Sequence, residues 1–182
     1  FESDGVEDDP DSIHGAVEDL PNGRVRISYD FSDDQQKFDF VPAAAGATRR
    51  ELNDGRLVVS GIGGADPLKM VLLDYDLHID SVSYRAELLS GDHVNVYVNT
   101  LWDGKWTPAV GCGGIHRFDG RLITFNGTAT ATTDTTPVER GFPYLGILDV
   151  SPMGMSWTIN ASPVLVEGAC YGGTDGTLAI GG

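Results

Sequence analysis

Hydrophobic and polar residues alternate along most of this chain, in short segments that turn-forming residues separate. The turns are marked by segments 53–55 (Asn-Asp-Gly), 90–92 (Ser-Gly-Asp) and 172–176 (Gly-Gly-Thr-Asp-Gly). Between them Val, Ile, Leu, Tyr and Thr recur at alternate positions, and no segment keeps a helical period. The pattern predicts an all-β protein, a two-sheet antiparallel jelly-roll sandwich of about 11–13 strands. The predicted strands cover residues 24–31, 56–60, 70–79, 82–89, 93–100, 114–118, 121–126, 144–150, 155–160, 164–167 and 177–180, and 129–137 is expected to be a loop or an edge strand.

Three consecutive segments, 70–79, 82–89 and 93–100, place apolar side chains on one face and polar side chains on the other. If they are neighbours in one antiparallel sheet, their polar sides merge into a single surface. Asp, His, Asn, Tyr and Arg side chains make directional hydrogen bonds, which favours a ligand-binding surface. The alternative is the solvated face that any half-exposed antiparallel sheet carries. The polar positions of this predicted meander are Asp74, Asp76, His78, Asp80, Ser83, Arg85, Glu87, His93, Asn95, Tyr97 and Asn99.

Two tryptophans, Trp102 and Trp106, follow the third segment and are expected near one rim of the sandwich. Exposed indole rings stack on the apolar faces of sugar rings, whereas buried ones would close the end of the core. Trp157 alternates with Met155 and Ile159 and is therefore expected inside the core. The predicted ligand-binding residues are Asp76, His78, Arg85, Glu87, His93, Asn95, Tyr97, Asn99, Trp102 and Trp106.

The charge is strongly acidic and unevenly distributed. The 182 residues include 12 Lys and Arg against 27 Asp and Glu, for a formal net charge of −15. This balance excludes a binder of the nucleic acid backbone, which needs clustered basic residues, and no apolar run is long enough to enter a membrane. Residues 1–20 carry eight acidic and no basic side chains. We therefore expect an acidic N-terminal segment or linker over 1–23 and a β-sandwich domain over 24–182.

Several motifs occur in a characteristic order. YDFSDD at 29–34 precedes LNDGRLVV at 52–59, the predicted meander follows, and WTIN at 157–160 precedes a closing GTLAIGG at 176–182. This order resembles the concanavalin A-like lectin/glucanase superfamily, and within it the secreted LamG-like and 3-keto-disaccharide-hydrolase-like domains of bacteria. The resemblance implies carbohydrate contact on the concave sheet or at the loop rim, an extracellular or cell-surface location, and a structural calcium ion. Such domains usually add a strand after the closing segment, so either the N-terminal segment supplies it or the chain is a piece of a longer protein.

The sequence contains little that indicates a catalytic site. A retaining glucanase of this superfamily would carry an E-x-D-x-x-E strand, and the chain has none. If the protein is a hydrolase, the residues near the chemistry are expected to be Asp74, Asp76, His78, Arg85 and Glu87. Calcium prefers six to eight oxygen ligands, partly from loops, which makes Asp54, Asp92 and Asp175 the candidate ligands. No other cofactor is expected.

These observations favour an exported carbohydrate-binding or cell-surface interaction domain that uses the polar face of the meander. The expected partner is a carbohydrate or a protein at the cell surface, without nucleic acid and without membrane insertion. The first alternative is a glycan-active hydrolase of the same fold. The second is a structural subunit of an extracellular protein assembly.

The two cysteines, Cys112 and Cys170, permit one disulfide, which an exported protein would form and a cytosolic one would keep reduced. The alternative is two unrelated buried thiols. Closing so long a loop stabilises the fold by about 4 kcal/mol in the chain-entropy model. We expect reduction to lower the free energy of unfolding by that amount in a urea titration, and to raise the intact mass by two hydrogens. An unchanged mass would show that the cysteines are unpaired.

Overall fold

The computed structural model describes residues 13–43, 48–61, 70–73, 75, 77–101, 111–125, 130–135, 137–167 and 176–181, and most of these lie in β-strands. Two short 3-10 helices, η1 (Pro21–Gly23) and η2 (Asp34–Asp39), accompany the strands. The strands are β1 (Ala16–Leu20), β2 (Arg24–Ser28), β3 (Phe40–Pro42), β4 (Thr48–Leu52), β5 (Leu57–Gly61), β6 (Met70–Leu73), β7 (Ser81–Glu87), β8 (His93–Thr100), β9 (Cys112–Arg117), β10 (Arg121–Phe125), β11 (Thr130–Asp134), β12 (Pro143–Ser151), β13 (Gly154–Ile159), β14 (Ser162–Glu167) and β15 (Thr177–Gly181). No helix in the described ranges is long and apolar enough to cross a membrane.

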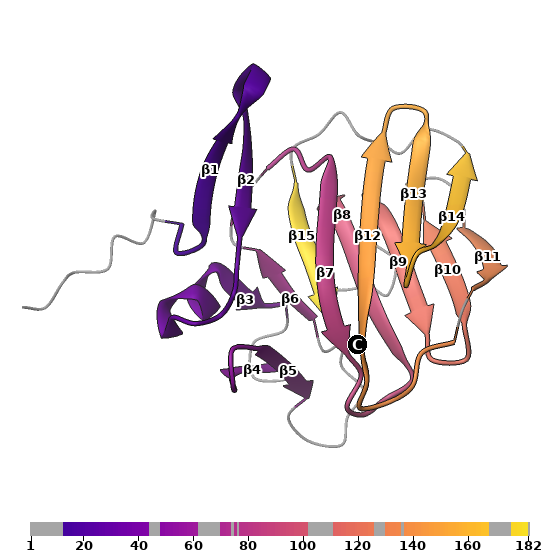
Figure 1. Cartoon of the computed structure of the whole chain (residues 1–182), viewed down its shortest axis with the longest axis horizontal. Helices are drawn as coiled ribbons and strands as arrows, with labels where there is room; N and C mark the ends of the chain where they lie inside the picture. The colour runs from indigo at the N-terminus through magenta and orange to yellow at the C-terminus, as the bar shows by residue number, and fades with distance from the viewer. Residues whose placement is uncertain are drawn as a thin grey trace, which may run out of the picture.

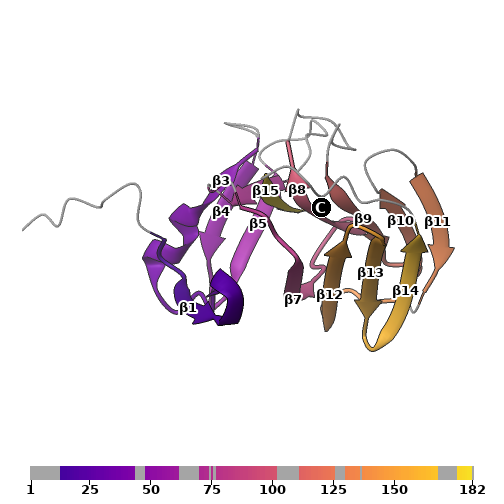
Figure 2. The same ribbon diagram turned by 90° about the horizontal axis from the view of Figure 1, so that it is seen from above.

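Two antiparallel sheets form the sandwich. The seven-stranded sheet has the order β11-β10-β9-β8-β15-β6-β3, and the four-stranded sheet has the order β14-β13-β12-β7. Two separate hairpins, β1–β2 and β4–β5, complete the described structure. Figures 1 and 2 show the four-stranded sheet beside β8–β11, with the two hairpins on the side of β3 and β6. The all-β, two-sheet antiparallel sandwich predicted from the sequence is confirmed.

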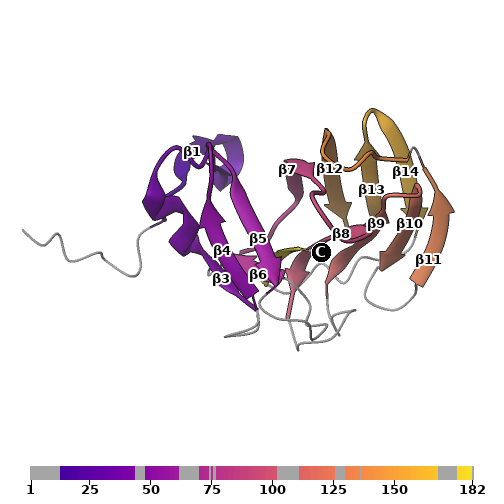
Figure 3. The same cartoon turned by 90° about the horizontal axis from the view of Figure 1, so that it is seen from below.

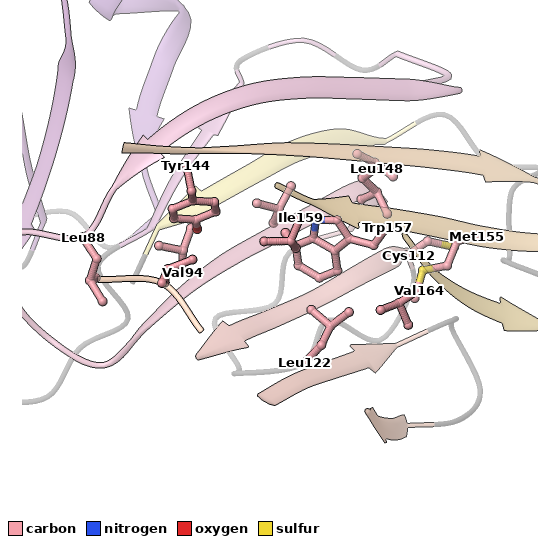
Figure 4. Packing of buried hydrophobic residues seen from close by; sticks show 13 residues of the cluster. Leu88, Val94, Cys112, Leu122, Tyr144, Leu148, Met155, Trp157, Ile159 and Val164 are labelled. Atoms are coloured by element: carbon pink, nitrogen blue, oxygen red, sulfur yellow. The ribbon is translucent and has the colours of Figure 1, made fainter. Parts of the chain in front are cut away.

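The main core lies between the four-stranded sheet and one half of the seven-stranded sheet (Figure 4). The apolar side of β8, with Val96 and Val98 fully buried, faces this core as alternation predicted. Trp157 is also fully buried, as predicted, and its indole N–H donates to the Tyr84 hydroxyl at 2.9 Å. Gly146 lies under the same tyrosine, where a Cβ would come within 2.1 Å of the ring. Any other residue at this position of β12 would require the Tyr84 ring to move.

A second apolar cluster covers the other half of the seven-stranded sheet. Phe40 of β3 and Val71 of β6 are buried there under side chains from the N-terminal region, including Tyr29 and Leu57. Leu178 of β15 packs against both clusters and therefore marks the boundary between them. The hairpins β1–β2 and β4–β5 thus lie where the four-stranded sheet does not reach (Figure 3).

Asp39, at the end of η2, is a buried carboxylate that connects the first hairpin to this cluster. Its Oδ2 accepts hydrogen bonds from the backbone N–H of His14 at 2.9 Å and from the Tyr29 hydroxyl at 2.8 Å. Its Oδ1 lies 2.5 Å from His14 Nδ1. Burial, followed by the hydrogen bond to Asp39, raises the pKa of Tyr29 above its usual range. A buried carboxylate is tolerated when donors satisfy both oxygens, so this network fixes where the first hairpin starts.

The positions of the strands were predicted from the sequence more accurately than their pairing in the sheets. All eleven predicted strands are present, and β11 takes the edge-strand alternative given for 129–137. Strands β1, β3 and β4 were missed, and the domain boundary drawn at residue 23 falls inside the β1–β2 hairpin, whose register pairs Leu20 with Arg24. Residues 1–12 lie outside the described part of the chain.

The predicted meander is wrong. Strand β15 lies between β6 and β8, and β7 belongs to the other sheet. Beyond β6, the described residues of the first predicted segment do not pair with β7 or β8: Leu77 forms an isolated bridge with Gly176, and the side chain of Asn99 hydrogen-bonds both backbone groups of Ile79. Asn99 Oδ1 accepts from Ile79 N–H at 2.6 Å, and its Nδ2 donates to the Ile79 carbonyl at 2.9 Å. Alternation reports which face a residue takes, but not which strand lies beside it.

Replacement of Asp39 by Asn should destabilise the protein, because an amide N–H would meet donors that now point at a carboxylate oxygen. We expect a loss of about 3 kcal/mol in the free energy of unfolding, measured by urea titration. The matched control is Asp34→Asn in the same helix, since the Asp34 side chain is 79% exposed. Its effect should stay within about 0.5 kcal/mol, and equal effects of the two substitutions would contradict a special role for Asp39.

Candidate functional site

The residues predicted for one polar surface are distributed over three places. Asn95 and Tyr97 lie on the side of the seven-stranded sheet opposite the main core, and both of them and Asn99 are fully buried. Tyr97 clusters there with Met70 and Ala179, and burial raises its pKa above the usual range. These side chains therefore do not form the open polar face that the alternation predicted.

Arg85 and Glu87 lie on the outer face of the four-stranded sheet, the face directed away from the main core. Glu87 forms an ion pair with Arg56, which precedes β5. His78 is exposed, and its Nε2 lies 3.5 Å from Asp80, which also pairs with Arg24 at 2.9 Å. The expectations for Asp74, Asp76, Trp102, Trp106, Asp175 and Cys170 concern residues outside the described ranges, and Cys112 is buried in β9.

Three connecting segments, 88–92, 118–120 and 137–142, come together at one end of the sandwich, the lower edge in Figure 1. Phe118 N–H donates to the Asp92 carbonyl at 2.9 Å, and Val138 N–H donates to the Phe118 carbonyl at 3.1 Å. The Arg140 guanidinium donates to the Gly91 carbonyl. Backbone hydrogen bonds therefore hold this rim in one arrangement, as a binding site built from loops requires.

Charged side chains form a network at the same rim. The Asp92 carboxylate accepts a hydrogen bond from the Arg117 guanidinium at 2.7 Å. It also contacts the ring of His93, the first residue of β8. Asp119 pairs with Arg121 at 2.8 Å. Hydrogen bonding to His93 and the charge of Arg117 lower the pKa of Asp92, and hydrogen bonding to Arg121 lowers the pKa of Asp119. Both carboxylates are therefore ionised and oriented at neutral pH.

An exposed aromatic ring accompanies this network. Phe118 is 38% exposed, and the Arg140 guanidinium lies 5.0 Å from its ring centroid, a cation–π geometry. Two further exposed apolar residues, Leu89 and Phe142, lie on the adjoining segments. The rim thus combines an aromatic surface with planar hydrogen-bonding groups. We call the following residues the rim cluster: Asp92, His93, Arg117, Phe118, Asp119, Arg121 and Arg140.

Sequence analysis anticipated Asp92 and His93 but assigned them to different sites, and it missed Arg117, Phe118 and Arg140. Their proximity depends on contacts between residues 25 and 49 positions apart, such as Asp92 with Arg117 and Gly91 with Arg140. The one available signal was the set of turns that flank them in the sequence.

The calcium candidates do not converge in the described part of the chain. Asp92 is engaged by Arg117 and His93, and Asp54 lies at the exposed tip of the β4–β5 hairpin with a positive φ of 52°. No group of three or more His, Cys, Asp or Glu side chains suited to a metal ion is found among the described residues.

Similarity searches identify the fold. No protein-family model matches the sequence, and no curated protein is a recognisable relative. The carbohydrate-binding module CBM66 from Bacillus subtilis superposes with a TM-score of 0.56 at 8% identity, over 78% of this chain and 86% of that one. Sheep galectin-11 in complex with glycerol gives a TM-score of 0.43 at 14% identity, over 64% of this chain and 91% of that one. Domains LG4-5 of the mouse laminin α1 chain give 0.40 at 16% identity, over 56% and 27%. The superposition on the carbohydrate-binding module shows that the chain shares the β-sandwich fold of that module.

Acid should weaken the rim through Asp92. Because its pKa is lowered in the folded state, the contribution of Asp92 to stability is present above the unfolded-state pKa of about 4 and is lost as the pH falls below it. We expect Asp92→Asn to make the fall in the free energy of unfolding between about pH 4 and pH 2 shallower, in denaturant titrations at each pH. The control Asp54→Asn, at the exposed hairpin tip, should keep the original slope. An unchanged slope in Asp92→Asn would contradict this assignment.

Proposed function

We propose that this protein is a non-catalytic carbohydrate-binding module and that the rim cluster contacts the sugar. The observation that carries the proposal is the exposed Phe118 ring, fixed by Arg140 beside the ionised network of Asp92 and Arg117. The overall likeness to a carbohydrate-binding module of Bacillus subtilis supports the same class of function.

The chemistry of the rim suits a neutral sugar. The C–H face of a pyranose packs on an aromatic ring, while its hydroxyl groups accept from guanidinium N–H groups and donate to carboxylates. Such hydrogen bonds are directional when the planar groups are held in place by one another, as in the pairs Asp92–Arg117 and Asp119–Arg121. A net charge of −15 opposes the approach of a polyanionic glycan.

The pKa shifts and ion pairs of the carboxyl groups in the described residues support binding without catalysis. A glycosidase needs two carboxyl groups at a fixed separation, one of them with a raised pKa. At Asp30, Asp92 and Asp119 the pKa is shifted downward, the opposite of what a general acid requires. The hydrolase alternative would also need Glu87 free, and it is paired with Arg56.

An exported, cell-surface location and a specific relationship to LamG-like or 3-keto-disaccharide-hydrolase-like domains belong to the same proposal. They rest on the pair of cysteines and the order of motifs in the sequence. A calcium ion that stabilises the module is a further part of it. Repeating the binding measurement with calcium and with a chelator tests that part, since a calcium-dependent module loses affinity on chelation.

A screen of the purified protein against an array of neutral and acidic glycans tests the proposal. We expect binding to a defined neutral glycan, and we expect Phe118→Ala to weaken it by at least about tenfold, because a sugar–aromatic contact of this kind is worth more than 1 kcal/mol. The matched control is Phe38→Ala, which removes a 48% exposed phenylalanine from η2. Silence of the array, or equal losses in both variants, would contradict the proposed site.

A further inference from the structure

Strand β7 ends the four-stranded sheet, so one of its edges has no strand beside it among the described residues. The hydrogen bond from Val150 N–H to the Asp80 carbonyl, at 2.8 Å, shows which β7 residues direct their backbone N–H and C=O groups toward β12. Because alternate residues are bonded in an antiparallel ladder, the backbone groups of even-numbered β7 residues point to β12. Those of Ser83 and Arg85 point to the open side, and no backbone partner for them is found in the described ranges.

The core is incompletely covered along the same edge. Val82 and Ala86 pack against the main core but stay partly exposed, whereas Leu148 and Trp157, on the next two strands, are fully buried. Apolar surface that remains accessible beside unpaired backbone groups is what an added strand would cover. The opposite face of β7 is exposed at Ser81, Ser83 and Arg85.

Arg85 carries a positive charge along this edge that no residue of the described ranges neutralises. Every other arginine of the described ranges contacts a carboxylate or a backbone carbonyl, and Arg85 has neither there. The ion pairs Arg24–Asp80 and Arg56–Glu87 lie at the two ends of β7. An arginine without a contacting carboxylate favours an acidic side chain at the position beside it, although the net charge of the chain opposes a long polyanion.

We propose that the free edge of β7 binds an extended acidic peptide segment of a partner protein by strand addition. The peptide backbone pairs with Ser83 and Arg85, its apolar side chains cover Val82 and Ala86, and its alternate acidic side chains face the Arg85 guanidinium. The two ion pairs at the ends limit the added strand to about six residues, or about 20 Å. A second copy of this chain is a poorer occupant, because two whole molecules of net charge −15 repel each other more strongly than one molecule repels a short peptide with a few carboxylates.

Amide hydrogen exchange followed by NMR tests the proposal on the intact chain. In the free protein the amides of Ser83 and Arg85 should exchange fast, while that of Tyr84, which points to β12, exchanges slowly. The probe is a blocked peptide of about six residues that alternates valine and aspartate, and its valine–lysine counterpart is the negative probe. The valine–aspartate peptide should slow exchange at Ser83 and Arg85, and the lysine peptide should not.

Three variants locate the site. Arg85→Glu should weaken binding of the valine–aspartate peptide by at least about tenfold, and Ser83→Pro should abolish it while leaving the β7–β12 ladder intact, since proline is tolerated at a strand edge. Arg49→Glu, on the exposed side of β4, is the control and should leave peptide binding unchanged.

Slow exchange of the Ser83 and Arg85 amides in the free monomer would overturn the proposal, as would peptide binding that is unaffected by Arg85→Glu. Protection that appears only with a doubling of the molecular mass would instead identify a second copy as the occupant and overturn the peptide assignment.

Discussion

The inner face of the seven-stranded sheet is wider than the four-stranded sheet that packs on it, and this mismatch governs the arrangement of the described structure. Apolar side chains continue across the whole inner face, from Leu122 on β10 to Phe40 on β3. Four strands cover only the part built by β8–β10. The remaining part would stay in contact with water, at a cost that grows with the apolar area, unless another segment covered it. The N-terminal hairpins pack over that part of the face. Leu178 contacts both the cluster under the four-stranded sheet and the cluster under the hairpins.

Small hairpins hold such a position only when they are fastened, because an isolated two-stranded sheet is marginally stable. The buried Asp39 carboxylate supplies one fastening through His14 and Tyr29. Ion pairs from Arg24 and Arg56 to the ends of β7 supply two more at the surface. The surface pairs are screened by salt, whereas the buried network is not, so the attachment of the hairpins combines a salt-sensitive and a salt-insensitive part.

The fold class followed from the sequence because period-two alternation and turn residues are local signals. The buried positions of Val96, Val98 and Trp157 were predicted on that basis. Strand order was not, because β15 enters between β6 and β8 through contacts that span about a hundred residues, and no local pattern records them. The surroundings of the described polar positions were not predicted for the same reason. Asn95 and Tyr97 have the polar character of a binding face but lie buried, while Arg117 and Arg140 reach the rim through tertiary contacts alone.

The central place of β15 has a consequence for the order in which the protein can assemble. Residues 177–181 are the last described strand to leave the ribosome, yet they pair with β6 and β8 and so join the two halves of the seven-stranded sheet. Until they emerge, those halves are separate sheets that expose unpaired edges and part of an apolar face. Non-local pairing of this kind slows folding and leaves aggregation-prone intermediates during synthesis. The seven-stranded sheet is therefore expected to close only after β15 has emerged, and a nascent chain stopped before β15 would depend on chaperones to stay unaggregated.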